Sequence, residues 1–204
     1  NTVIADDPHE RIFHVRHGND LRVADKSRAG SSSLALGVPA PASSPTATVN
    51  GTPEDGADLE SRAYVVTLVN SFGEEGPPSN PSSVVDVGPN QDVALSFDNN
   101  VVGDYDIERV RIYRSSGGQY LFVGYSTTES FTDSLDAVAL GEPLLSESWN
   151  PPPDDGISGL VAMPGGFLVA WKDNELLFSE QGLPHAWPFE FRQVVDWNIV
   201  GCGV

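Results

Sequence analysis

Three stretches in the middle of the chain decide the fold: YVVTLV (64–69), RVRIYR (109–114) and YLFVGY (120–125). Each is rich in β-branched and aromatic residues, which suit the pleated surface of a sheet. In the first stretch Tyr64, Val66 and Leu68 fall on one face, because successive side chains of a strand point to opposite sides. No long segment of the chain has the periodicity of a helix. The sequence therefore predicts an all-β protein.

Shorter runs of the same kind follow these stretches or lie between them, at 84–87, 92–97 and 130–133. Turns rich in Gly, Asn and Ser separate them, and the chain as a whole holds 20 Gly and 16 Pro. Short strands at this spacing are typical of a β-sandwich. We predict one sandwich domain over residues 45–148.

The segments on either side of this domain predict further sheet structure. Residues 11–15 and 20–24 predict a β-hairpin with its turn at 17–19, and residues 34–41 predict an extended strand that runs into a linker. We expect residues 1–44 to belong to a flanking β domain.

Residues 149–204 begin with a stiff linker, WNPPPDDG (149–156), because consecutive prolines favour an extended backbone. Three strands at 159–163, 167–171 and 175–179 then predict a β-meander, followed by a final strand at 199–204. Such a meander is typical of one blade of a propeller. The chain starts at Asn1 rather than Met and stops in an apolar run, so we expect it to be part of a longer polypeptide.

The charge of the chain is strongly negative, with 11 Lys and Arg against 29 Asp and Glu and a net charge of −18. Residues 45–150 carry 17 of those acidic residues. Such a surface repels nucleic acid and anionic membranes, which argues against a protein that reads DNA sequence. The acid either lines a channel through which DNA slides or keeps the protein soluble.

The residue types that carry chemistry are few. The single cysteine, Cys202, excludes an internal disulfide and a thiolate zinc cluster. His14 and His17 would point to opposite faces of a strand and do not indicate a metal site. Acidic clusters at 54–58, 104–106 and 154–156 offer oxygen ligands for Ca²⁺ but lack the spacing of an EF-hand, so solvated loop charge is the favoured interpretation. With neither a nucleophile motif nor a phosphate-binding loop, we predict no catalytic residue, no metal and no cofactor.

Two places are candidate interfaces. His185 and Trp187 lie in LPHAWP (183–188), which two prolines hold as a contact loop or, alternatively, as a cap on the end of the meander. Arg109 and Arg111 share one face of a strand with Tyr113. This basic and aromatic face could pair with acid on a neighbouring subunit, or form an ion pair within the chain.

Residues 64–134 resemble a fibronectin type III domain. RIYRSSGG (111–118), YLFVG (120–124) and FTDS (131–134) are similar to the central stretch of that family, and YVVTLVNSFGEE (64–75) with Pro78 and Ser79 is similar to its last hairpin. In the family this hairpin comes after the central stretch, whereas here it comes first. The resemblance implies a permuted or inserted sandwich.

The order of motifs along the chain resembles the tail nozzle or tail tube proteins of short-tailed bacteriophages, in which a propeller-like domain carries inserted modules. The motifs are LGVPAP (36–41), FGEEGPPS (72–79), RIYR (111–114), GEPL (141–144), GLVAMPGGFL (159–168) and FSEQGLPHAWP (178–188). The resemblance implies a structural virion protein whose copies form a ring. Its partners would be neighbouring tail or portal and adaptor proteins, with DNA passing without sequence-specific contact and no membrane.

The alternative function is an adhesin module that binds carbohydrate or a cell surface. Exposed, co-planar aromatic side chains would support it. The chain has four tryptophans, at 149, 171, 187 and 197, and three of them lie beside prolines or in apolar strands, which favours packing. A hydrolase is a third class, with no recognisable constellation of catalytic residues.

Overall fold

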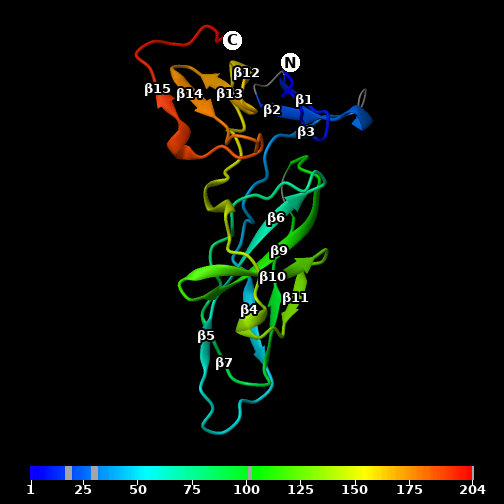
Figure 1. Ribbon diagram of the computed structural model, residues 1–204, viewed down its shortest axis with the longest axis vertical. Helices are drawn as coiled ribbons and strands as arrows, with labels where there is room; N and C mark the ends of the chain where they lie inside the picture. Colours follow the sequence, from blue (N-terminus) through cyan, green and yellow to red (C-terminus); the bar gives the residue numbers. More distant parts are fainter. Residues whose placement is uncertain (17–19, 29–31, 101–102, 204) are drawn as a thin grey trace. The chain divides into compact units, whose positions relative to one another are not determined.

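The computed structural model describes residues 1–16, 20–28, 32–100 and 103–203. These residues form fifteen β-strands, paired antiparallel, and four 3₁₀ turns of three residues each (Figure 1). The predicted all-β class is confirmed. Within the described ranges, no helix has the length and apolar character needed to cross a bilayer.

The chain divides into two compact units. Unit 1 comprises residues 1–39, 102–106 and 148–204, and unit 2 comprises residues 40–101 and 107–147. The domain boundaries predicted from the sequence were near residues 45 and 149. The prediction did not assign the short segment 102–106 to unit 1.

Unit 2 contains two three-stranded sheets and one strand pair. The first sheet has the order β10-β9-β6, the second the order β11-β8-β4, and β5 pairs with β7. The strands are β4 (Thr46–Asn50), β5 (Glu60–Arg62), β6 (Tyr64–Asn70), β7 (Val85–Val87), β8 (Asp92–Ser96), β9 (Ile107–Ser116), β10 (Gln119–Ser126) and β11 (Ser130–Asp133). The 3₁₀ turns Ala137–Ala139 and Ser146–Ser148 follow them.

Strand β6 is an edge strand of the first sheet, yet all seven of its residues are buried. The register of β6 against β9 pairs Tyr64 with Arg114, so both side chains are on the same face of the sheet. The hydroxyl of Tyr64 donates to the carboxylate of Asp133 in β11, at 2.8 Å. This face therefore looks toward the second sheet, and the buried apolar residues of both sheets form the core between them.

Both edges of the first sheet are occupied. Beside β6, the amides of Gly76, Ser79 and Ser82 donate to carbonyl groups of the strand. Beside β10, residues 141–144 make backbone bonds to Tyr120 and Phe122. Covered edges leave few unpaired backbone groups for unintended pairing with another chain.

Unit 1 contains the sheets β1-β2-β3 and β12-β13-β14-β15. Their strands are β1 (Ile12–Val15), β2 (Leu21–Ala24), β3 (Leu34–Ala35), β12 (Gly159–Met163), β13 (Phe167–Lys172), β14 (Glu175–Phe178) and β15 (Gln193–Val194), with 3₁₀ turns at Lys26–Arg28 and Phe189–Phe191.

The predicted hairpin and meander of unit 1 are confirmed. Strands β1 and β2 pair antiparallel from Ile12 with Ala24 to Val15 with Leu21, and the predicted turn at 17–19 lies outside the described residues. Strands β12, β13 and β14 follow one another antiparallel. The first connection turns at Gly165 and Gly166, whose φ angles of 105° and 79° suit a residue without a side chain.

The predicted final strand at 199–204 is wrong for residues 199–203. The outer edge of β14 is already taken by β15, since Glu175 pairs with Val194. Beyond β15 the chain makes an isolated backbone hydrogen bond, from the amide of Ile199 to the carbonyl of Asp173, and no strand ladder in the residues described. Val200 is fully exposed. An apolar run becomes a strand only where a neighbouring edge is free to receive it.

Candidate functional site

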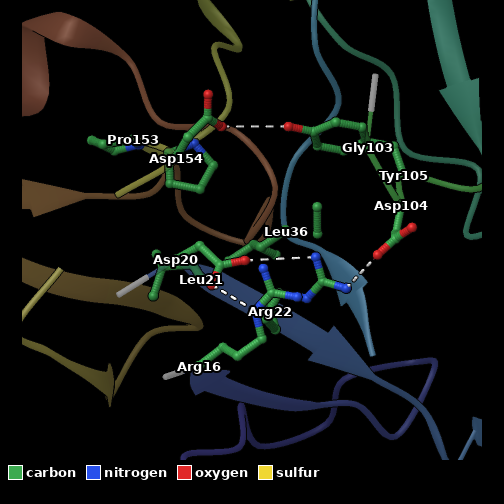
Figure 2. A pocket seen from close by; sticks show the side chains of 12 residues that line it. Arg16, Asp20, Leu21, Arg22, Leu36, Gly103, Asp104, Tyr105, Pro153 and Asp154 are labelled. Atoms are coloured by element: carbon green, nitrogen blue, oxygen red, sulfur yellow. Dashed lines mark hydrogen bonds and ion pairs between the residues drawn. The ribbon is translucent and has the colours of Figure 1, made fainter. Parts of the chain in front are cut away.

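A polar pocket in unit 1 gathers charged side chains from three parts of the chain (Figure 2). Residues before and within β2, the segment 103–105 and the Pro-rich linker all contribute to it. Its polar and charged lining residues are Arg16, Asp20, Arg22, Asp104, Tyr105 and Asp154.

Arg22 lies at the centre of this pocket and is 4% exposed. Its Nη2 donates to the Asp104 carboxylate at 3.0 Å and to the carbonyl of Ser33, and its Nη1 lies 3.6 Å from the Asp20 carboxylate. Asp20 also accepts from Nε of Arg16 at 2.9 Å. Because burying an unpaired guanidinium costs several kcal/mol, these partners are what allow Arg22 to be buried here.

The same contacts hold the segment 103–106 in unit 1, although residues of unit 2 flank it in sequence. The carbonyl of Asp104 accepts from the amide of Ala35 at 2.9 Å, and Asp106 accepts from Arg28 at 2.6 Å. The hydroxyl of Tyr105 lies 3.5 Å from the Asp154 carboxylate, and burial together with that carboxylate raises the pKa of Tyr105. Each of these groups fastens one part of the chain to another.

The charged groups of the pocket therefore serve to hold three segments of the chain together. Its carboxylates are each engaged by an arginine or by the Tyr105 hydroxyl. Among the residues that the structure describes, no three His, Cys, Asp or Glu side chains are grouped closely enough to hold a metal ion. His14 is half-buried on β1, and His17 lies outside the described residues.

A second cluster lies on the outer face of the β10-β9-β6 sheet, on the side away from the core of unit 2. Arg109, Arg111 and Tyr113 alternate with inward residues on β9 and pair with Val69, Thr67 and Val65. On β10, Phe122 and Tyr125 stand opposite Tyr113 and Arg111. The predicted common face of the two arginines and Tyr113 is therefore present.

Arg111 is paired within the chain. Its Nη1 lies 2.9 Å from the carboxylate of Glu75, its Nη2 bonds Glu142, and its guanidinium carbon is 4.6 Å from the centre of the Phe122 ring. The intramolecular ion pair, one of the two interpretations of this face, is the one that Arg111 forms.

Glu75 is the buried acceptor of this cluster and is 8% exposed. Its carboxylate accepts from the hydroxyls of Thr67 at 2.6 Å and Tyr113 at 2.7 Å, in addition to Arg111. Burial and the adjacent Glu75 charge raise the pKa of Tyr113 well above its ordinary value. The phenol of Tyr113 therefore remains a donor at every physiological pH.

Arg109 differs from Arg111. Its guanidinium carbon lies 4.8 Å from the centre of the Tyr125 ring, and Tyr125 is 49% exposed. Among the described residues, no carboxylate lies within ion-pair distance of Arg109, and its buried Nε has no hydrogen-bond partner. The other three arginines of unit 2, Arg62, Arg111 and Arg114, each have a carboxylate partner.

His185 and Trp187 lie inside unit 1, with 3% and 1% of their surface exposed. Nε1 of Trp187 donates to the carbonyl of Pro184, its amide donates to the carbonyl of Asn150, and His185 meets the ring of Trp149 edge-on. Neither side chain is available at the surface of this chain. These contacts of the two residues are with the loop's own Pro184 and with the linker residues Trp149 and Asn150.

An exposed apolar segment follows that loop and was not singled out from the sequence. Over residues 189–200 it carries six exposed large apolar side chains, which are Phe189, Phe191, Val194, Val195, Trp197 and Val200. Phe191 also lines a groove with Phe167 of β13 and Phe178 of β14. The signal in the sequence was three aromatic residues within nine positions after Pro188.

No protein-family model matches the sequence, and no curated protein matches it significantly.

Proposed function

We propose that the chain is a non-catalytic structural subunit of a bacteriophage tail, of the nozzle, tube or head–tail connection type, which assembles with copies of itself into a closed ring. The observation that carries the proposal is the exposed apolar segment 189–200 in unit 1. Trp197 is 82% exposed and Phe189 is 59% exposed, which leaves large aromatic surfaces in water. Contiguous apolar patches mark interaction sites, and aromatic residues dominate the centres of interfaces.

A ring of identical copies is the assembly that the resemblance to tail proteins implies. Most soluble oligomers are closed and symmetric, because closure leaves no interaction surface unsatisfied. In such a ring the exposed segment 189–200 would be covered by the neighbouring copy. Adjoining tail, portal or adaptor proteins would bind the two ends of the ring, in the virion.

The strand order of unit 2 supports a fibronectin-III-like module in permuted form. Residues 64–82 form a hairpin, because Gly76, Ser79 and Ser82 bond back onto β6. This hairpin precedes β8, β9, β10 and β11 in sequence and lies beside β9 in the sheet. In unit 1, the order β12-β13-β14-β15 is that of one four-stranded blade and supports a propeller-like domain.

The charge of the chain supports a role beside DNA without affinity for it. The net charge is −18, and unit 2 holds four arginines, three of them neutralised by carboxylates. A wall of this charge repels phosphates, so DNA would pass along it without being held.

The tryptophans do not support the adhesin alternative. Trp187 is buried and Trp149 and Trp171 are half-buried, so Trp197 is the one exposed indole among the described residues. A stacking platform of several tryptophans is therefore not formed in this chain.

The oligomeric state in solution tests the proposal. We expect the purified chain to form one discrete closed oligomer by light scattering, native mass spectrometry and negative-stain microscopy. The variant Phe189→Ser with Trp197→Ser should shift it toward the monomer, whereas the control Val138→Ser, at an apolar position of unit 2 that is 96% exposed, should not. A monomer at every accessible concentration would overturn the proposal, and glycan binding lost in Trp197→Ala would favour the adhesin.

A further inference from the structure

Arg109 has no carboxylate partner among the described residues, although unit 2 is rich in Asp and Glu. None of its N–H groups donates a hydrogen bond to a described residue, and no described carboxylate is in ion-pair range. The ring of Tyr125 lies against one side of the guanidinium, at 4.8 Å, and is itself half-exposed. An aromatic neighbour of this kind orients a guanidinium and removes part of its water, while its donors stay open to a planar acceptor.

The geometry of Arg109 suits a carboxylate. A guanidinium presents paired N–H groups that match the two oxygens of a carboxylate, and such pairs are stronger than neutral hydrogen bonds. Arg111, one step along the same face, also has carboxylate partners, because its Nη1 contacts one oxygen of Glu75 and its Nη2 contacts one oxygen of Glu142. A carboxylate brought by another molecule would give Arg109 the kind of partner that Arg111 has within the chain.

The richest exposed source of carboxylates in the same unit is the acidic loop, which we define as residues 52–59. Glu54, Asp55 and Asp58 are exposed in it, and the apolar Leu59 beside them is 52% exposed. The loop precedes β5 and lies beyond β5 and β7 within unit 2 (Figure 1). It therefore offers both charge and apolar surface to a partner.

The acidic loop and Arg109 of one chain lie at opposite ends of unit 2. The loop leads through β5 to the start of β6, where Tyr64 pairs with Arg114. Arg109 pairs with Val69, five residues further along β6, which corresponds to roughly 17 Å at about 3.3 Å per residue. An acidic loop can therefore reach Arg109 only from another copy.

We infer that Arg109, held against Tyr125, receives a carboxylate of the acidic loop of the next copy. The inference rests on the proposed self-assembly and adds its direction: one end of unit 2 binds the other end of unit 2 in the neighbour. A contact between two different surfaces is head-to-tail, and head-to-tail contacts are the kind that close into rings.

Charge reversal with restoration tests the contact. Arg109→Glu alone, and Glu54→Arg with Asp55→Arg alone, should each weaken association about tenfold or more, within the range of charge pairs at protein interfaces. The chain carrying all three changes should associate again. A mixture of the two weakened chains should also assemble, because each presents the complement of the other.

Two controls make the result specific. Asp136→Arg with Glu147→Arg reverses two exposed carboxylates elsewhere in unit 2 and should leave association unchanged. Circular dichroism and thermal unfolding confirm that each variant folds. If the unaltered chain assembles but Arg109→Glu has no effect, or the triple change does not restore association, the inference is overturned while the ring stands. If the unaltered chain never assembles, both are overturned.

Discussion

Arg114 and Asp133 form an ion pair inside unit 2, and both side chains are 0% exposed. Asp133 also accepts from the hydroxyl of Tyr64, and Arg114 donates to the carbonyl of Leu135. Removing one member of a buried pair leaves the other charge uncompensated. We expect Asp133→Ala to lower the free energy of unfolding by about 3–5 kcal/mol in urea titrations.

The control for this prediction is an exposed ion pair. Asp155 contacts Lys172 at 3.0 Å with 82% of its side chain exposed. Exposed pairs contribute between about 0 and 1 kcal/mol, so Asp155→Ala should leave the urea midpoint nearly unchanged. Equal losses in the two variants would show that burial does not set the importance of Asp133.

Asp7 gives unit 1 a dependence on acid pH. Burial alone would raise the pKa of Asp7, but hydrogen bonds and charge from Arg11 outweigh it and lower the pKa below the ordinary 3.8. The unfolded chain therefore binds the proton at higher pH than the folded chain does. The stability that Asp7 contributes is complete above about pH 3.8 and is lost as the pH falls through the folded pKa.

Unfolding measured from pH 6 to pH 2 checks this sign. Replacing Asp7 by Asn should lower the stability at pH 6 and flatten its decline in acid, because the group that titrates is gone. A decline identical to that of the unaltered chain would contradict the assignment. Arg11→Gln is the matched second variant, because it removes the partner of Asp7 and so breaks the same ion pair.

The pairing of β12 with β13 depends on a residue without a side chain. Gly159 stands opposite Trp171, and a methyl group on Gly159 would overlap the indole ring. Overpacking of this kind costs about 1–3 kcal/mol. Gly159→Ala should lower the thermal unfolding temperature, whereas Gly201→Ala, where nothing lies within 4 Å, should not.

Strands with large alternating side chains could be predicted from the sequence. Strands that form only because an adjacent strand offers a free edge could not. Strand β6 was clear, because its seven residues are β-branched, aromatic or apolar apart from Asn70. Strand β4 reads TATVN and lacks a large side chain, so its only signal is the edge of β8 that receives it. The two residues of β15 likewise depend on β14, while the more apolar run after it forms no strand.

The candidate sites divide in the same way. The alternation of β9 placed Arg109, Arg111 and Tyr113 on one face in advance. Which arginine is neutralised depends on Glu75 and Glu142, which are 36 and 31 residues from Arg111 in sequence. The burial of Trp187 depends on its packing, which includes a bond to Asn150. Contacts over such separations carry no local signal.

At the scale of the whole molecule, the net charge of −18 governs the affinity of the chain for DNA. In the described residues, eight of its eleven cations contact an Asp or Glu carboxylate within 3.0 Å, and these are Arg11, Arg16, Arg22, Arg28, Arg62, Arg111, Arg114 and Lys172. Binding of duplex DNA requires several free cations that displace counterions from phosphates. A surface of this kind has few to offer.

We therefore expect the assembled protein not to bind duplex DNA even at low salt, where phosphate contacts are strongest. Fluorescence anisotropy of a labelled duplex, measured from 20 mM to 200 mM salt, checks this. A variant in which Glu54, Asp55, Asp58 and Asp92 are changed to Lys should gain weak binding that disappears as salt rises, because it presents a new cluster of cations. Salt-sensitive binding by the unaltered chain would mean that its surface retains DNA. The proposal that DNA passes along this protein without being bound would then be wrong.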